Sequence, residues 1–231
     1  IILHQEGSSP GRIGMMLRER GYGLDIRRPR FGDPLPETMA GHAGAIIFGG
    51  PMSANDEDDY VRREIDWISV PLREEAPLFG ICLGAQMMAR QLGAKVSGHP
   101  KGCVEVGYYP LRATGAGEEF GAWPDKVYQW HVEGLELPRG ADLLAEGDAF
   151  PVQAFRYGPA AFGVQFHPEL TLAMMHRWTV RGAHRFALPG AQQASAHFYG
   201  RYVHDAANKA WLSRFFDRWL NGRGQKISVN G

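Results

Sequence analysis

Cysteine is scarce in this sequence: among 231 residues there are two, Cys82 and Cys103. Two cysteines cannot build the disulfide framework of a small secreted protein, and a chain of this length buries enough surface to fold without cross-links. The scarcity is typical of a reducing compartment, so we expect a cytoplasmic protein.

The sequence also lacks an excess of charge of either sign, because 25 Lys and Arg balance 25 Asp and Glu. A strongly basic nucleic-acid-binding surface needs a cationic excess that displaces counterions, so we expect no nucleic-acid partner. No apolar run approaches the ~20 residues of a membrane-spanning helix, and no basic segment followed by an apolar core opens the chain. We therefore expect no membrane association.

Glycine, in contrast, is abundant: there are 30 in 231 residues, nearly twice the usual fraction of roughly 7%. This predicts many tight turns and close backbone approaches. The first half alternates short apolar runs with helical patterns, which is typical of βα units around a parallel sheet. We predict strands at 1–3, 24–27, 45–48 and 78–81. We predict helices at 13–20 and 83–92, and another whose first turn is the acidic run 56–59 and which ends at about residue 70.

The second half has a different pattern, in which short strands with turns extend the sheet and helices follow. We predict strands at 104–111, 126–130, 143–145, 152–156 and 161–166, and helices at 172–180 and 204–220. A loop or insertion is expected at 185–195. No linker or repeat interrupts the chain, so we predict one domain over 1–231, with a helical extension from about residue 182 whose aromatic side chains pack onto the rest.

The most informative segment runs from Gly80 to Gln86, where Gly-Ile-Cys-Leu-Gly lies between an apolar strand and a helical pattern. Small residues at 80 and 84 allow the strand and the helix to approach closely, so the turn projects Cys82 from the sheet edge as in a nucleophile elbow. The N-terminus of the helix favours the thiolate form. The other interpretation of the motif is a tight turn around a structural cysteine.

A thiolate nucleophile needs a base, and His167 follows a predicted strand in Gln-Phe-His-Pro-Glu. Pro168 restrains the direction of the chain, and Glu169 is close enough to orient the imidazole and stabilise its protonated form. Cys82, His167 and Glu169 therefore form a candidate triad, which is defined by its roles and not by its order in the chain.

A third segment, Gly49-Gly50-Pro51-Met52-Ser53, follows the predicted strand at 45–48. Backbone N–H groups in this turn, together with the N–H of Leu83 after the nucleophile, are candidate donors to the oxyanion that forms when a carbonyl is attacked. On its own, a turn with two glycines is equally typical of an ordinary βα connection.

The remaining cysteine and histidines lack such surroundings. We interpret Cys103 as a buried small apolar residue. The other histidines show no tight metal-ligand spacing, so we expect packing or surface roles for most of them and no metal site; they include His131, His176, His184, His197 and His204.

Taken together, the three segments resemble the class I, triad-type glutamine amidotransferases, in particular stand-alone proteins similar to the glutaminase domain of GMP synthetase. The segments 49–53, 80–86 and 163–169 occur in the family's order, and the resemblance covers roughly residues 1–180. It implies a flavodoxin-like three-layer α/β sandwich with a mostly parallel central sheet, in agreement with the βα alternation.

The resemblance also implies residue roles. The family's nucleophile falls on Cys82, its base on His167, its orienting carboxylate on Glu169, and its oxyanion donors on the backbones of Gly50 and Leu83. Substrate-contacting positions fall on Gln86, Gly107, Tyr108, Trp130 and His131. Two of these segments depart from the family's usual pattern. Val132-Glu133 follows His131 where relatives often have Gly-Asp, and Gly107-Tyr108 replaces the more frequent Gly-Trp.

By this resemblance the protein is a cysteine-nucleophile amide hydrolase that releases ammonia from glutamine through a γ-glutamyl thioester, with no cofactor. The sequence has no phosphate-loop motif, so we expect either that a separate synthetase partner receives the ammonia or that the protein hydrolyses a γ-glutamyl compound for its own sake. The first alternative is a γ-glutamyl hydrolase that acts on γ-glutamyl amines or peptides. A second alternative, a non-catalytic regulatory or binding module, predicts a damaged triad, whereas all three residues are present.

Overall fold

The computed structural model describes residues 1–221, and the last part of the predicted domain, 222–231, lies outside the described residues. Its centre is a six-stranded sheet with the strand order β1-β2-β10-β9-β8-β5. Three neighbouring strands at one end run parallel, and the others continue the sheet antiparallel. The strands are β1 (Ala45–Ile47), β2 (Leu78–Ile81), β10 (Ala161–Val164), β9 (Ala154–Tyr157), β8 (Ala141–Glu146) and β5 (Arg112–Ala113).

Two further pairs of strands lie outside this sheet. The predicted strands near 104–111 and 126–130 are confirmed, but they pair with each other instead of extending the main sheet. A second small pair was not predicted, because its members are only three residues long and mostly polar or glycine. The pairs are β4 (Glu105–Pro110) with β6 (Lys126–His131), and β3 (Val96–Gly98) with β7 (Glu133–Leu135).

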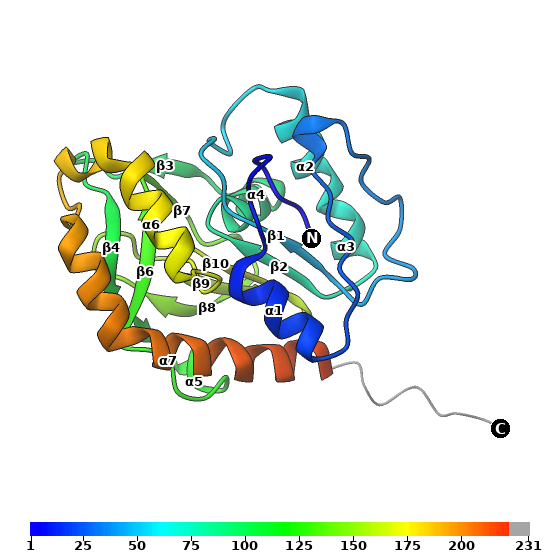
Figure 1. The fold of residues 1–231 in the computed structure, drawn as a ribbon. Coiled ribbons are helices and arrows are strands. Elements are labelled where there is room, and N and C mark those ends of the chain that lie inside the picture. The colour runs from blue at the N-terminus through cyan, green and yellow to red at the C-terminus, as the bar shows by residue number, and fades with distance from the viewer. Residues whose placement is uncertain (222–231) are drawn as a thin grey trace.

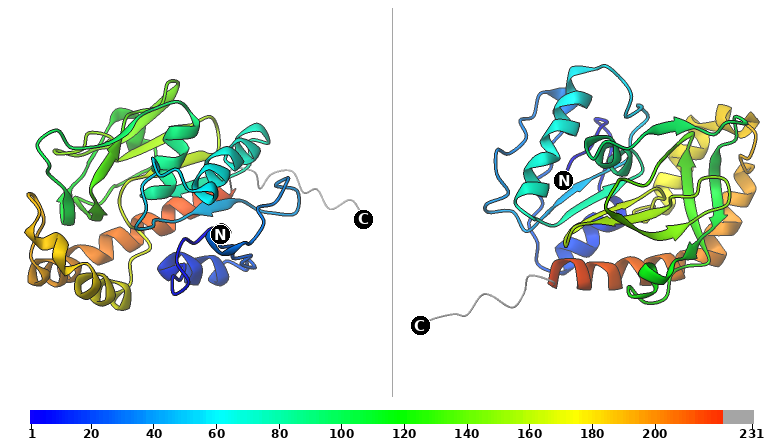
Figure 2. Two further views of the ribbon diagram at one scale, coloured as in Figure 1. Left: turned by 90° about the horizontal axis from the view of Figure 1, so that it is seen from above. Right: turned by 180° about the vertical axis from the view of Figure 1, so that it is seen from behind.

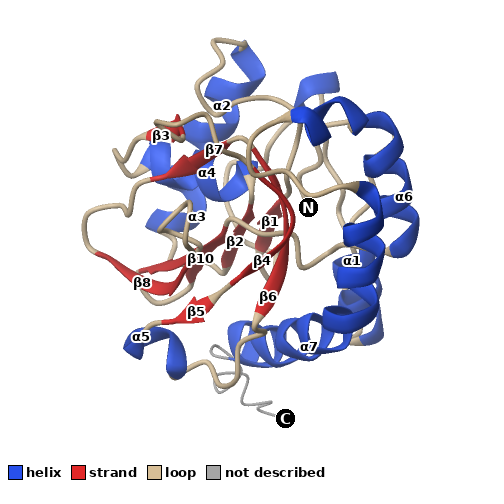
Figure 3. Ribbon diagram, turned by 90° about the vertical axis from the view of Figure 1, so that its left-hand side faces the viewer, coloured by secondary structure: helices blue, strands red, loops and turns tan. Residues whose placement is uncertain are grey.

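Helices cover both faces of the main sheet, which confirms the predicted three-layer α/β sandwich. In Figure 3, α1 and α7 lie on one side of the sheet, with α6 beside them, and α2, α3 and α4 lie on the other. The helices are α1 (Gly11–Glu19), α2 (Asp59–Trp67), α3 (Ser69–Arg73), α4 (Leu83–Gln91), α5 (Gly115–Glu118), α6 (Leu172–Arg181) and α7 (Ala194–Asn221), with 3₁₀ turns η1 (Pro29–Phe31) and η2 (Ala183–Ala187).

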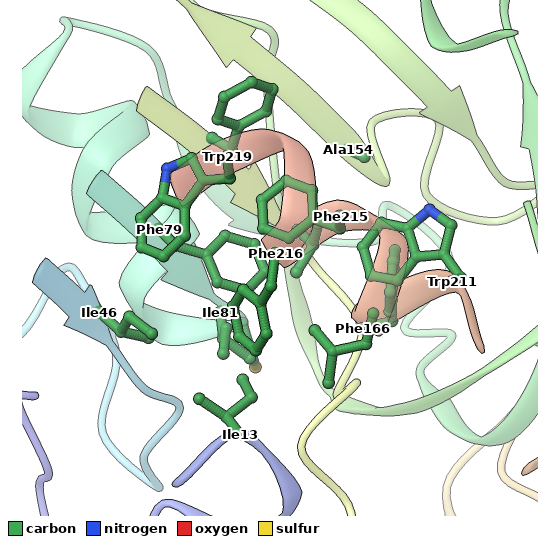
Figure 4. Close-up of a cluster of buried hydrophobic side chains, with 14 of the residues drawn as sticks. Ile13, Ile46, Phe79, Ile81, Ala154, Phe166, Trp211, Phe215, Phe216 and Trp219 are labelled. Carbon is green, nitrogen blue, oxygen red and sulfur yellow. The ribbon is translucent and has the colours of Figure 1, made fainter. Parts of the chain in front are cut away.

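The core lies in two layers because the strands are buried on both faces. Successive side chains of a strand point to opposite faces: Phe79 joins the cluster under α1 and α7, whereas Leu78 joins the cluster under α2 and α4. Figure 4 shows the first of these clusters, where Phe79 and Ile81 of β2 meet aromatic side chains of α7. A strand with both faces buried is an apolar run without alternation, which is why the sequence identifies the segment 78–81 as a strand.

The C-terminal helix is longer than predicted. It begins at Ala194 and runs along the molecule beside α1 (Figures 1 and 2). The predicted loop at 185–195 is therefore only partly a loop, since η2 and the first turn of α7 occupy both its ends. The expected packing of the aromatic stripe is confirmed, because all its members are at most 7% exposed: Trp211, Phe215, Phe216 and Trp219.

Other local predictions differ from the structure. The predicted strands at 1–3 and 24–27 are reduced to single parallel bridges, from Ile2 to Arg27 and to Ile47. The helix predicted to reach about residue 70 is interrupted at Ile68 and divided into α2 and α3, and Pro71 lies in the short helix α3. Proline is tolerated there because N–H groups in the first turn of a helix have no intrahelical acceptor. None of the helices in the described part of the chain is long and apolar enough to cross a membrane.

Candidate active site

The candidate site lies where three parallel strands end side by side. β1 is followed by Gly49 and Gly50, β2 by Cys82, and β10 by the turn that carries His167. Because the carboxyl ends of neighbouring parallel strands meet at the same edge of a sheet, three segments far apart in the sequence converge there. The backbone N–H of Cys82 continues the pairing beyond β2 by donating to the carbonyl of Val164, at 2.8 Å.

Cys82 occupies the turn between β2 and α4 in a strained conformation. Its backbone has φ 50° and ψ −105°, and it is one of two non-glycine residues with positive φ in residues 1–221. Such a conformation costs on the order of 1–3 kcal/mol and persists only where the surroundings impose it. Here the close approach of helix and strand imposes it: a Cβ at Gly84 would lie 2.2 Å from the carbonyl oxygen of Ile47. The predicted elbow geometry is therefore present.

His167 and Glu169 form a buried pair beside the elbow. The Nδ1 atom of His167 lies 2.7 Å from Oε1 of Glu169, and both side chains are almost inaccessible to solvent. The backbone of each residue is also held: the N–H of His167 donates to Tyr128, and the carbonyl of Glu169 accepts from Arg12. The second ring nitrogen of His167, Nε2, is buried without a hydrogen-bond partner among the described residues.

Electrostatics favour a protonated His167. Burial by itself lowers the pKa of the imidazole, but the nearby charges of Glu169 and Cys82 outweigh burial and raise the pKa of His167 to about 10. The imidazolium therefore lies between a carboxylate and a potential thiolate. This is the charge arrangement that a cysteine nucleophile needs, because the neighbouring cation stabilises the thiolate.

The glycine turn after β1 faces this pair. A Cβ at Gly49 would lie 2.8 Å from Cε1 of His167, so only glycine allows the turn to approach the ring this closely. Neither the N–H of Gly50 nor that of Leu83 donates a hydrogen bond within residues 1–221. Leu83 is the first residue of α4, where N–H groups lack intrahelical acceptors. Both predicted oxyanion donors are thus free at the same edge of the sheet.

A second buried histidine, His4, contacts the backbone of the glycine turn. Nδ1 of His4 lies 3.3 Å from the carbonyl oxygen of Gly49, and its Nε2 lies 2.7 Å from Oε2 of Glu64. Both side chains are 0% exposed. The C=O of Gly49 and the N–H of Gly50 belong to one peptide unit and point in opposite directions. By holding the carbonyl, His4 therefore fixes the direction of the Gly50 N–H.

Of the predicted substrate-contacting residues, Gln86 and His131 meet at one backbone atom. The carbonyl oxygen of Glu133 accepts from Nε2 of Gln86 and from Nδ1 of His131, at 2.8 Å in each case. On its other side, His131 lies 3.0 Å from the buried carboxylate of Glu105. The Glu133 carboxylate accepts from the hydroxyl of Ser53 at 2.6 Å. These contacts tie the end of β6 to the first turn of α4 and to the glycine turn.

The other three predicted contact residues lie one layer away from the triad. Trp130 packs against Trp178, and the Trp178 ring in turn contacts His167 with a centroid distance of 4.8 Å. Tyr108 is buried under α7. Gly107 and Tyr108 adjoin Gln192, whose side-chain amide hydrogen-bonds to both backbone groups of Tyr108.

Sequence reasoning missed three residues that adjoin the site: His4, Glu64 and Arg185. His4 and Glu64 are 60 positions apart and share no motif. The one available signal for Glu64 was a charged residue at a position that the helical period places on the buried face of α2. Cys103, expected to be buried, is half-exposed. No group of three His, Cys, Asp or Glu side chains able to hold a metal occurs among the described residues.

Comparisons with known proteins identify the family of this chain. The family model for class-I glutamine amidotransferases matches residues 11–181. The chain is 30% identical to a glutamine amidotransferase-like protein of Salmonella typhimurium over 97% of this chain and 98% of that protein. It is 32% identical to one of the subunits of the GMP synthase of Thermococcus kodakarensis, over 74% of this chain and 88% of that relative. The matches to full-length GMP synthases cover a smaller share, for example 26% of one such protein.

A solved structure supports the same relationship. The glutamine amidotransferase of Methylobacillus flagellatus superimposes with a TM-score of 0.88 over 96% of this chain and 93% of that chain, at 25% sequence identity. Its likeness therefore extends to α7, beyond the segment that the family model matches. The chain thus belongs to the class-I glutamine amidotransferase family, whose members are cysteine-dependent glutamine amide hydrolases.

Proposed function

We propose that this protein hydrolyses the side-chain amide of glutamine to glutamate and ammonia, with Cys82 as nucleophile, His167 as acid and base, and Glu169 as the orienting carboxylate. One observation carries the proposal: a cysteine in a strained elbow lies beside a buried imidazole whose other side is held by a carboxylate at 2.7 Å. A merely structural cysteine would not require a strained backbone or a neighbouring cation.

In the first half of the reaction, the Cys82 thiolate attacks the amide carbon of glutamine and forms a carbon–sulfur bond. The carbonyl electrons move to the oxygen, and the resulting oxyanion accepts hydrogen bonds from the N–H groups of Gly50 and Leu83. His167 then gives its proton to the leaving nitrogen as the carbon–nitrogen bond breaks. Ammonia leaves, and a γ-glutamyl thioester remains on Cys82.

In the second half, His167 is neutral and accepts a proton from water, which attacks the thioester carbon. The same two N–H groups hold the second oxyanion. The carbon–sulfur bond breaks, glutamate leaves, and the thiolate–imidazolium pair is restored. Glu169 accepts a hydrogen bond from Nδ1 of His167 throughout, which keeps Nε2 directed toward the reacting atoms.

We propose further that the ammonia passes to a separate synthetase partner. The support is the similarity to a protein named as one of the subunits of a GMP synthase. We also place the protein in the cytoplasm, because its proposed nucleophile is a free thiol and needs a reducing compartment.

The test is ammonia release from glutamine by the full chain, with the Cys82→Ala variant as control. We expect turnover by the wild type and none above background by the variant. The same assay is run with a panel of γ-glutamyl amines and peptides. If Cys82-dependent cleavage occurs with one of these but not with glutamine, the protein is a γ-glutamyl hydrolase and the glutamine proposal is wrong. Unchanged turnover by Cys82→Ala would overturn the mechanism.

A further inference from the structure

The segment expected to be a loop at 185–195 carries a positive charge into the neighbourhood of the site. Arg185 lies in η2, whose backbone is closed by hydrogen bonds from Arg185 to Gly182, at 2.9 Å, and from Leu188 to Arg185, at 3.0 Å. Arg185 and the adjacent Phe186 are half-buried, whereas His184 and Ala187 on either side of them are exposed. The turn therefore directs this one charged residue inward.

A continuous series of contacts connects Arg185 to the catalytic imidazole. Its Nη1 donates to the backbone carbonyl of Trp130, at 3.4 Å, and the adjacent Phe186 packs edge-to-face on the Trp130 ring. Trp130 packs on Trp178, with centroids 5.9 Å apart, and Trp178 packs on His167, at 4.8 Å. The guanidinium is thus held at the end of β6, three residues before the Glu133 carbonyl that accepts from Gln86 of α4.

The charge of Arg185 has no counter-ion in the described part of the chain. Among residues 1–221, no carboxylate lies within ion-pair distance of it, whereas the more deeply buried Arg12 is paired with Asp205. Burial lowers the pKa of Arg185, and the charge of Cys82 opposes this effect. A half-buried cation without a counter-ion is costly unless an anion from outside completes it.

We propose that Arg185 binds the α-carboxylate of the substrate, and so restricts the site to γ-glutamyl compounds in which this carboxylate is free. A γ-glutamyl compound carries its α-carboxylate a few carbon–carbon bonds from the carbonyl that Cys82 attacks. The planar guanidinium matches a carboxylate with two parallel hydrogen bonds. This inference rests on the proposed function for its substrate, but the charge at Arg185 can be tested without turnover.

The first experiment compares the alkylation of Cys82 by iodoacetate, an anion, and by iodoacetamide, its neutral counterpart, with modified peptides quantified by mass spectrometry. Any effect on thiolate reactivity acts on both reagents, so the ratio of the two rates reports attraction of the anion alone. Cys103 serves as an internal reference in the same molecule. We expect a higher iodoacetate-to-iodoacetamide ratio at Cys82 than at Cys103, and a fall of about 10-fold at Cys82 in Arg185→Gln.

Two further variants control this result. Arg181→Gln removes an exposed arginine four positions away and is expected to leave the ratio unchanged. Arg185→Lys keeps the charge and is expected to keep most of the anion preference, which also excludes loss of folding as the cause. An unchanged ratio in Arg185→Gln, or no labelling of Cys82 by either reagent, would overturn the inference.

The second experiment measures kcat/KM for glutamine and for glutamine α-amide, which lacks the carboxylate. We expect Arg185→Gln to lower kcat/KM for glutamine by about 10- to 100-fold and to have little effect on the α-amide. Equal losses with both substrates would contradict carboxylate binding. If glutamine is not hydrolysed at all but the alkylation ratio still depends on Arg185, the proposed function fails and the anion site stands.

Discussion

Two buried histidine–glutamate pairs lie at the same edge of the sheet, with the same distance between ring nitrogen and carboxylate oxygen. In each pair a ring nitrogen lies 2.7 Å from a carboxylate oxygen, between His167 and Glu169 in one and between His4 and Glu64 in the other. They differ in what the second ring nitrogen faces. In His167 it has no hydrogen-bond partner among the described residues and Cys82 is nearby, whereas in His4 it is bound to the carbonyl of Gly49.

This difference separates a group available for chemistry from a group used for positioning. An imidazole can transfer a proton only through a nitrogen that the protein leaves free, and His167 has one. Both nitrogens of His4 are occupied, so it can only hold the glycine turn in place. The comparison predicts that changes at the first pair lower activity far more than changes at the second pair, whose main effect is on stability.

The largest effect is expected from His167→Asn. Without the imidazole, neither protonation of the leaving ammonia nor activation of water is possible, so kcat/KM for glutamine should fall by about 10⁴-fold. Urea denaturation should show that the variant still folds, so that the loss of activity is a loss of chemistry. A decrease in kcat/KM below about 10-fold would show that His167 is not the proton-transfer group.

Glu169→Gln should have the next largest effect, with a decrease of about 10²-fold in kcat/KM, because a neutral amide stabilises the imidazolium less. The pKa of His167 is raised to about 10 in the wild type, so the alkaline limb of its kcat/KM profile should lie near that pH. In the variant the limb should move to lower pH. A limb that does not move would contradict the assigned role of Glu169.

The same pair should also make stability depend on pH. A histidine whose pKa is raised on folding contributes stability that is fully present below its unfolded pKa, about 6.5, and is lost as the pH rises through about 10. The difference in unfolding free energy between the wild type and Glu169→Gln should therefore shrink from about pH 6 to about pH 10. A difference that grows over this pH range would contradict the raised pKa of His167.

Glu64→Leu should show the opposite balance of effects. It leaves the fully buried His4 without its carboxylate, at a cost of about 3 kcal/mol in the free energy of unfolding. Activity should fall only about 10-fold, through a less fixed Gly50 N–H. Glu64→Gln, which can still hydrogen-bond to His4, should lie between this variant and the wild type. If Glu64→Leu lost as much activity as His167→Asn, the distinction between the two pairs would be wrong.

The smallest effect is expected from Cys103→Ser. Cys103 is half-exposed and free, so its replacement should change both kcat/KM and the unfolding free energy very little. A large loss of activity in this variant, measured beside Cys82→Ala, would show that the two thiols do not have the separate roles assigned to them.

The sequence predicted the parts of the site that lie within short segments. Cys82, and His167 with Glu169, are each found in a contiguous motif after an apolar strand, and parallel pairing brings the motifs together. The His4–Glu64 pair is not local, because only the folded sheet brings α2 under the first residues. Arg185 was missed for a related reason: a 3₁₀ turn in weakly patterned sequence gives no signal of which side chain points inward.

The fold was predictable to a similar extent. Strands buried on both faces, such as 78–81, are continuous apolar runs and are easily identified. The pairing of β4 with β6 depends on partners and not on either strand's own residues. The first turns of α7 were missed because Tyr199, Tyr202 and Val203 are exposed on the helix, which obscures its amphipathic period.

The central claim is that Cys82 is the nucleophile for a glutamine-like substrate, and a covalent trap tests it most directly. The full chain is treated with 6-diazo-5-oxo-L-norleucine, an electrophilic analogue of glutamine, and its peptides are analysed by mass spectrometry. The account predicts one adduct, on Cys82, formed more slowly when glutamine is added and absent in Cys82→Ala. Labelling of Cys103 instead, or labelling of Cys82 that glutamine does not slow, would contradict it.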